Sequence, residues 1–209
     1  MPRPPATVTA PRKLPKQARS AELVGAILQA AIRVLEREGA AAFTTVRVAE
    51  QAGVSVGSLY QYFPNKESIL FRLQEQEWVR TGQLLEGIFT DARLAPAERL
   101  RVAVGAFFRS ECDEAPLRRA LGDAAPIYRD APHARQQRVR TLKVLDDLIG
   151  QVVSGLSPRR RAFAAELYIA LMTSMGENIS ESGRTPAEVD AWAAATGDMF
   201  LAYLRELKR

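Results

Sequence analysis

The sequence predicts an all-α fold, and three observations support that prediction. Apolar residues recur at spacings of three and four along most of the chain, which is the period of an amphipathic helix. Capping residues precede these segments, and Gly or Pro follows them, so the helices have defined starts and ends. The 209 residues contain neither the alternating pattern of a strand nor an internal repeat.

Composition limits the class of protein. Hydrophobic residues make up 47% and charged residues 25% of the chain, which is typical of a globular protein. No apolar run approaches the roughly 18 residues that a membrane span requires, and the N-terminus lacks the apolar core of a signal peptide. The single cysteine, Cys112, excludes an internal disulfide. We therefore expect a cytoplasmic protein without a membrane segment.

Residues 1–19 differ from the remainder of the chain. They contain five prolines, no acidic residue and no hydrophobic period, so we expect a disordered arm. Its five positive charges equal the net charge of +5 for the whole sequence. Two compatible interpretations remain open, namely a contact with the phosphates of a nucleic acid and a tail that charge keeps soluble.

Residues 20–65 are expected to form a three-helix domain. The first helix begins at Ser20 and ends at Gly39. Thr44 or Thr45 can cap a second helix, and Gly53 suits its C-terminal end. The chain between residues 44 and 63 thus reads as two short helices joined by a turn containing Gly, which is the helix-turn-helix pattern.

The last of these helices is expected to face a partner. Ser55 can cap it, Pro64 is expected to stop it after about two turns, and Leu59 and Phe63 face inward. The outer positions carry no charge, which is unusual for a solvated helix and suits the major groove of DNA. These outer residues are Val56, Gly57, Ser58, Tyr60, Gln61 and Tyr62.

This stretch also resembles a known family. The run AFTTVRVAEQAGVSVGSLYQYFPNKE is similar to the signature of the tetracycline-repressor (TetR) family of bacterial transcriptional regulators. With the preceding helix, the resemblance covers roughly residues 20–70, and beyond that it extends only to length and helical pattern. It implies that the chain binds a double-stranded DNA operator as a homodimer.

Individual roles in DNA contact follow. Val56, Gly57, Tyr60 and Gln61 are expected to meet base edges, since Gln pairs with adenine and apolar groups meet the thymine methyl. Arg47 is expected at either the backbone or a groove edge. The resemblance implies that Thr45, Ser55, Ser58, Tyr62 and Lys66 touch phosphates. The alternative for Tyr60 and Tyr62 is ordinary packing between helices.

Residues 66–209 are expected to form a helical ligand-binding and dimerisation domain. Asn65 can cap a long helix that ends near Phe89. Further helices are expected over residues 97–112, 117–121, 132–153, 157–179 and 185–207, and Val139, Leu142, Leu145, Ile149 and Val152 form the buried stripe of the 132–153 helix.

The last two helices have more apolar surface than one core requires, which predicts a dimer interface formed as a four-helix bundle. The alternative is that they only cover the preceding helices. The expected interface residues are Phe163, Leu167, Leu171, Trp192, Met199, Phe200 and Tyr203.

The preceding helices would enclose a pocket if the protein senses a small, apolar or amphipathic effector. Such a stripe of aromatic and Met residues is equally compatible with an ordinary core. The candidate lining residues are Trp78, Phe107, Phe108, Tyr128, Tyr168, Met172 and Met175.

No catalytic site, cofactor site or metal site is indicated. The single histidine, His133, leaves no relay or His cluster, and no Gly-rich phosphate loop is present. We therefore interpret the chain as a transcriptional repressor released by a ligand, and not as an enzyme. An activator or ligand-independent regulator of the same fold, or a helical protein–protein interaction module, remains the alternative.

Overall fold

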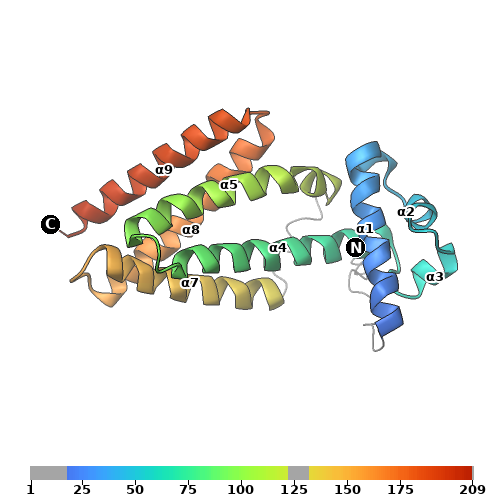
Figure 1. Ribbon diagram of the computed structural model, residues 1–209, viewed down its shortest axis with the longest axis horizontal. Coiled ribbons are helices and arrows are strands. Elements are labelled where there is room, and N and C mark those ends of the chain that lie inside the picture. The colour runs from blue at the N-terminus through green and yellow to red at the C-terminus, as the bar shows by residue number, and fades with distance from the viewer. Residues whose placement is uncertain (1–17, 122–131, 209) are drawn as a thin grey trace, which may run out of the picture. The chain divides into compact units, whose positions relative to one another are not determined.

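The computed structural model describes residues 18–121 and 132–208, and these residues form helices without any strand (Figure 1). The predicted all-α fold is confirmed. The chain divides into two compact units: unit 1 includes residues 18–77 with the end of α5 (116–121), and unit 2 includes residues 78–115 and 132–208. None of the described helices is both long and apolar enough to cross a membrane. The predicted arm, residues 1–19, lies outside the described residues except for its last two.

Unit 1 is built on three helices and the start of a fourth. They are α1 (Ala18–Glu38), α2 (Thr45–Ala52), α3 (Val56–Tyr60) and α4 (Lys66–Thr90), with a short 3-10 turn at Ala40–Ala42. Helix α1 packs against α2, and α2 packs against α3. The largest fully buried side chains of this unit are Ile27, Phe43, Leu59, Phe63 and Ile69.

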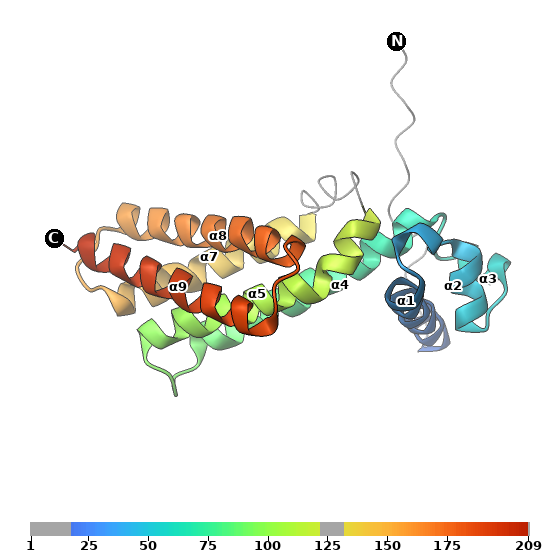
Figure 2. The ribbon, with the colours of Figure 1, turned by 90° about the horizontal axis from the view of Figure 1, so that it is seen from above.

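Unit 2 contains the second part of α4 together with α5 (Pro96–Leu121), α7 (Pro132–Val152), α8 (Pro158–Glu181) and α9 (Pro186–Glu206). Helix α7 lies beside α8, and α8 lies beside α9 (Figure 2). The prediction that a helix ends at Cys112 and a separate one covers 117–121 is wrong, because α5 continues through Pro116. A proline favours a helix end without enforcing it.

The starts of α8 and α9 confirm the predicted capping signals. Ser157 accepts a hydrogen bond from the amide of Arg160, and Pro158 occupies the first position of α8. Thr185 and Glu188 bond to each other's backbone amide at the start of α9. Hydrogen bonds from Thr185 hold the pKa of the Glu188 carboxyl below its ordinary value.

The core of unit 2 centres on Tyr168. Its side chain is 1% exposed, and its hydroxyl donates a 2.7 Å hydrogen bond to the carbonyl oxygen of Leu100. Its ring packs edge-on against Phe89 and Phe200, at centroid distances of 6.2 and 4.8 Å. One side chain of α8 therefore contacts residues of α4, α5 and α9.

Two ion pairs join α5 to α9. Arg101 contacts Asp198 and Arg109 contacts Asp190, each with a nitrogen–oxygen distance of 2.7 Å. Higher numbers on α5 pair with lower numbers on α9, so the helices are antiparallel. At Gly197 an added Cβ would lie 3.3 Å from the Cα of Arg101, so the absence of a side chain permits this close approach.

The predicted stripe of α7 is only partly correct. Leu145 and Ile149 are buried, whereas Val139 is 69% exposed. At 100° per residue, Val139 lies about 240° around the helix from Leu145, so the two cannot share a narrow face. Leu148, which the prediction omitted, is 1% exposed and belongs to the core.

The buried hydroxyl of Tyr168 generates a stability prediction. We expect Tyr168→Phe to lower the free energy of unfolding by about 1 kcal/mol, because one buried hydrogen bond is lost. Chemical denaturation followed by circular dichroism measures this change. The partly exposed Tyr203 is the control, and Tyr203→Phe is expected to change stability by a smaller amount.

Burial also raises the pKa of the Tyr168 hydroxyl. Between the unfolded-state pKa of about 10 and the higher folded-state value, only the folded protein keeps this proton. The contribution of Tyr168 to stability is therefore complete below pH 10 and is lost as pH rises above it. A Tyr168→Phe protein whose stability fell as steeply above pH 10 as that of the parent would contradict this assignment.

Candidate nucleic-acid interface

Local hydrogen bonds fix the turn between α2 and α3. Thr44 is the cap of α2, and its hydroxyl accepts a 3.2 Å bond from the amide of Arg47. Gly53 ends α2 with φ of +68°, a left-handed conformation that costs a glycine little. Ser55 then caps α3 by accepting a 3.0 Å bond from the amide of Ser58. The predicted caps and turn are confirmed.

Helix α3 is shorter than predicted. It ends at Tyr60 after five residues, whereas the sequence suggested two turns up to Pro64. The amides of Tyr62 and Phe63 both bond to the carbonyl oxygen of Leu59, at 3.0 and 2.9 Å, so the chain leaves the helix in a tight turn. Pro64 has no amide hydrogen with which to continue it.

The two faces of α3 differ as the sequence predicts. Leu59 is fully buried, and Tyr60 is 41% exposed. Gly57 and Gln61 are exposed, and Val56 and Ser58 are partly exposed. The described surface of α3 and of the following residue, Gln61, therefore presents an aromatic ring, an amide and backbone without a charged side chain.

The prediction that Tyr62 lies on the outer side of the helix is wrong. Its side chain is only 8% exposed. It lies beyond the end of α3, so the helical period used for the prediction no longer sets its direction. Packing between helices, the alternative considered for this residue, agrees better with its burial.

Thr45 and Tyr60 lie together although they belong to different helices. The Thr45 hydroxyl and the Tyr60 hydroxyl form a 3.1 Å hydrogen bond. This bond joins the first residue of α2 to the last residue of α3 and restricts the position of the Tyr60 ring. Both residues are among the predicted DNA contacts, but their contact with each other could not be predicted from the sequence.

The two predicted cations have different surroundings. Arg47 forms an ion pair with Glu38 of α1, and its side chain remains 54% exposed. Lys66 is exposed at the first residue of α4. Asn65 precedes it and accepts a 2.8 Å bond from the amide of Ser68, which confirms the predicted cap.

Val46 is a surface residue that the sequence reasoning missed. Its side chain is 47% exposed at the second residue of α2. Its exposure could have been predicted from the sequence, because Val46 lies off the apolar stripe formed by Val48 and Ala49, both of which are fully buried.

The candidate ligand-lining residues mostly lie in one core. Phe108, Tyr168 and Met172 are buried in the hydrophobic cluster of unit 2, and Phe107 and Met175 pack against it. Trp78 is a partly buried residue of α4, and Tyr128 lies outside the described residues. The burial of these residues is equally compatible with a ligand pocket and with an ordinary packed core.

The candidate interface residues of α8 and α9 divide into two groups. Phe163, Trp192 and Met199 are 58%, 42% and 50% exposed, while Leu167, Leu171 and Tyr203 are partly exposed. The prediction that Phe200 belongs to the interface is wrong, because its side chain is 2% exposed and packs against Tyr168. A second copy of the chain cannot reach Phe200.

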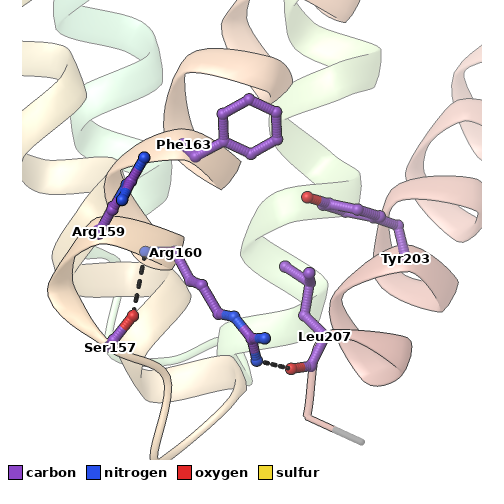
Figure 3. A pocket seen from close by; sticks show the side chains of 6 residues that line it. All are labelled: Ser157, Arg159, Arg160, Phe163, Tyr203 and Leu207. Carbon is purple, nitrogen blue, oxygen red and sulfur yellow. Dashed lines mark hydrogen bonds between the residues drawn. The ribbon is translucent and has the colours of Figure 1, made fainter.

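A hollow of about 360 Å³ lies between the start of α8 and the end of α9 (Figure 3). Arg160 closes part of it by donating a 3.2 Å hydrogen bond to the carbonyl oxygen of Leu207. The aromatic rings of Phe163 and Tyr203 lie along the opposite part. The lining residues are Ser157, Arg159, Arg160, Phe163, Tyr203 and Leu207.

Metal-ligating side chains are dispersed. Within the residues that the structure describes, no group of three or more His, Cys, Asp or Glu side chains is arranged to hold a metal ion. Cys112 is partly buried in α5.

Two family descriptions match this chain. Residues 27–73 match "Bacterial regulatory proteins, tetR family", and residues 95–207 match "Tetracyclin repressor-like, C-terminal domain". The first match contains α2, α3 and the turn between them, and the second begins at the start of α5.

Individual relatives are more distant. The chain is 42% identical over 65 residues to the nucleoid occlusion factor SlmA of Aliivibrio fischeri, which covers 29% of this chain and only a third (33%) of that protein. It is 26% identical over 165 residues to the HTH-type transcriptional regulator BetI of Burkholderia thailandensis, covering 77% of this chain and 80% of BetI.

A solved structure shares the fold. The regulator FadR from Bacillus subtilis, in complex with stearoyl-CoA, has a TM-score of 0.59 at 18% identity and covers 85% of this chain and 97% of FadR.

Proposed function

This chain belongs to the TetR family of bacterial regulatory proteins, and we propose that it acts as a repressor. In this proposal a homodimer binds a palindromic operator, and a small apolar or amphipathic molecule releases it. The family consists of DNA-binding transcription regulators. The observation that carries the proposal is the uncharged surface of α3, where Thr45 holds the exposed ring of Tyr60.

We assign the residues of this surface to different parts of the duplex. Val56, Gly57, Tyr60 and Gln61 lie on or directly after the short helix α3, which suits insertion into the major groove. The cations Arg47 and Lys66 and the hydroxyls of Thr45, Ser55 and Ser58 suit phosphate contacts, which fix register and not sequence. Tyr62 has too little exposed surface for a major contribution.

Two substitutions separate base contact from phosphate contact. We expect Tyr60→Ala to weaken binding to a selected operator by about 1–3 kcal/mol while sparing non-specific binding, because a base contact is lost. Lys66→Ala should weaken binding to all duplexes alike and lower the salt slope by about one unit. Fluorescence anisotropy over a salt series measures both, and parental affinity in both variants would refute the proposed interface.

The surfaces of α8 and α9 support a homodimer. Each helix has one face in the core of unit 2 and an opposite face with exposed apolar side chains, including Phe163 on α8 and Trp192 and Met199 on α9. Small residues between them permit a close helix approach. These exposed small residues are Ala170, Ser174, Ala191, Ala195 and Ala202.

A dimer also accounts for the hollow beside Phe163 and Tyr203 (Figure 3). It lies on the same apolar surface, and protein interfaces pack about as densely as protein interiors. We infer that a side chain of the partner subunit fills it. The exposed Arg159 at its edge favours an acidic or polar group at the rim of that contact.

Charge in this surface tests the dimer. We expect the double variant Phe163→Glu, Met199→Glu to be monomeric by light scattering, because an unpaired buried charge is costly. It should keep its helical spectrum and lose operator binding far more than non-specific binding, since two half-sites are no longer bound together. The control is Val139→Glu, which adds charge at an exposed valine of α7 and should stay dimeric. A parental protein that is monomeric at micromolar concentration would contradict the proposal.

The effector is proposed to bind within unit 2. Phe107, Phe108, Met172 and Met175 supply apolar surface there, so a ligand with an apolar part is favoured. Stearoyl-CoA, the ligand bound to FadR, is the first compound to test. Helix α4 is continuous from Lys66 to Thr90 and carries residues of both units, so we propose it as the element that transmits binding.

Reciprocity provides the test of an inducer. A ligand that lowers operator affinity by some factor must itself bind more weakly by the same factor when operator is bound, which corresponds to about 1–3 kcal/mol. Trp78 emission in a Trp192→Phe background reports ligand binding with and without saturating operator. A ligand affinity that is identical in both conditions would exclude that compound as an inducer acting through DNA release.

A further inference from the structure

An exposed valine lies beside the proposed DNA-binding surface. Val46 is 47% exposed and Tyr60 is 41% exposed, and in the described residues of unit 1 these two are the large hydrophobic side chains left most open. Single exposed apolar residues are common on protein surfaces and need no explanation. Two of them that are linked through one neighbouring residue are more informative.

The two exposed residues are linked through Thr45, the residue that precedes Val46. Val46 directly follows Thr45, whose hydroxyl forms a 3.1 Å hydrogen bond with the Tyr60 hydroxyl. The start of α2 and the end of α3 are therefore held together, and the exposed Val46 lies one residue from that contact. Tyr60 itself belongs to the surface proposed to contact DNA.

Local structure does not require a valine at position 46. The buried side of α2 is formed by Val48 and Ala49, and Val46 is not one of the buried core residues. A β-branched residue is also a weaker helix former than Ala, Glu or Lys at an exposed position. The first turn of α2 carries no acidic residue, so a nearby phosphate would not be repelled from within it.

We propose that Val46 contacts the C5-methyl group of one thymine in each operator half-site and so makes that base pair part of the recognised sequence. In the major groove the thymine methyl is the one apolar group that distinguishes the base pairs, and an aliphatic side chain complements it. This inference rests on the proposed function and adds α2 to the elements that read bases.

The test removes the methyl group from the DNA and from the protein separately. A duplex that the parental protein selects from a random pool is prepared again with each thymine replaced singly by deoxyuridine, which keeps base pairing and lacks the methyl. We expect one replacement per half-site to weaken parental binding about fourfold, the worth of one buried methyl. Val46→Ala should bind the unmodified duplex more weakly and lose nothing further at that replacement.

Val79→Ala is the matched control, because Val79 is a similarly exposed valine (40%) on α4 in unit 2. It should respond to every deoxyuridine as the parent does. Equal responses of Val46→Ala and the parent at all thymines, or a parent that responds at none, would overturn the inference while leaving the proposed function intact. A parent that selects no duplex would instead overturn the proposed function.

Discussion

The fold of unit 2 depends on the burial of one tyrosine. Tyr168 is held by a hydrogen bond to the carbonyl oxygen of Leu100 and by edge-on contacts with Phe89 and Phe200, so side chains of α4, α8 and α9 and the backbone of α5 meet at one point. Because this contact directs one face of α8 and one face of α9 inward, their opposite faces are necessarily outward. The apolar residues proposed to form the dimer lie on these outward faces and are therefore exposed.

Unit 1 is stabilised in a different way. Helices of eight and five residues are too short to form alone, since helix nucleation is costly. Caps at Thr44 and Ser55 supply partners for the first amides of each helix, and burial of Leu59 holds α3 against the rest of the unit. The caps are local in sequence, and therefore the helices and the turn of this short stretch could be predicted from its residues alone.

The difference between interactions that are local in sequence and contacts between distant helices explains which predictions succeeded. Helix starts at Asn65, Ser157 and Thr185 were predictable because a cap and its partner lie three residues apart. The burial of Tyr62 and Phe200 was not, because it depends on which distant helix faces each side chain. The Thr45–Tyr60 contact and the hollow beside Phe163 likewise require the three-dimensional arrangement. The sequence therefore predicted the local caps better than it predicted the contacts between helices.

The ion pairs between α5 and α9 restrict how unit 2 can move. Exposed pairs such as Arg101–Asp198 and Arg109–Asp190 contribute little to stability, but both have to be broken if α9 slides along α5 by one helical turn of about 5.4 Å. Gly197 keeps the two backbones close at the same place, which leaves little room for a tilt. These contacts therefore fix the register of α9 along α5. A rearrangement of unit 2 that keeps both ion pairs has to take place in the other helices.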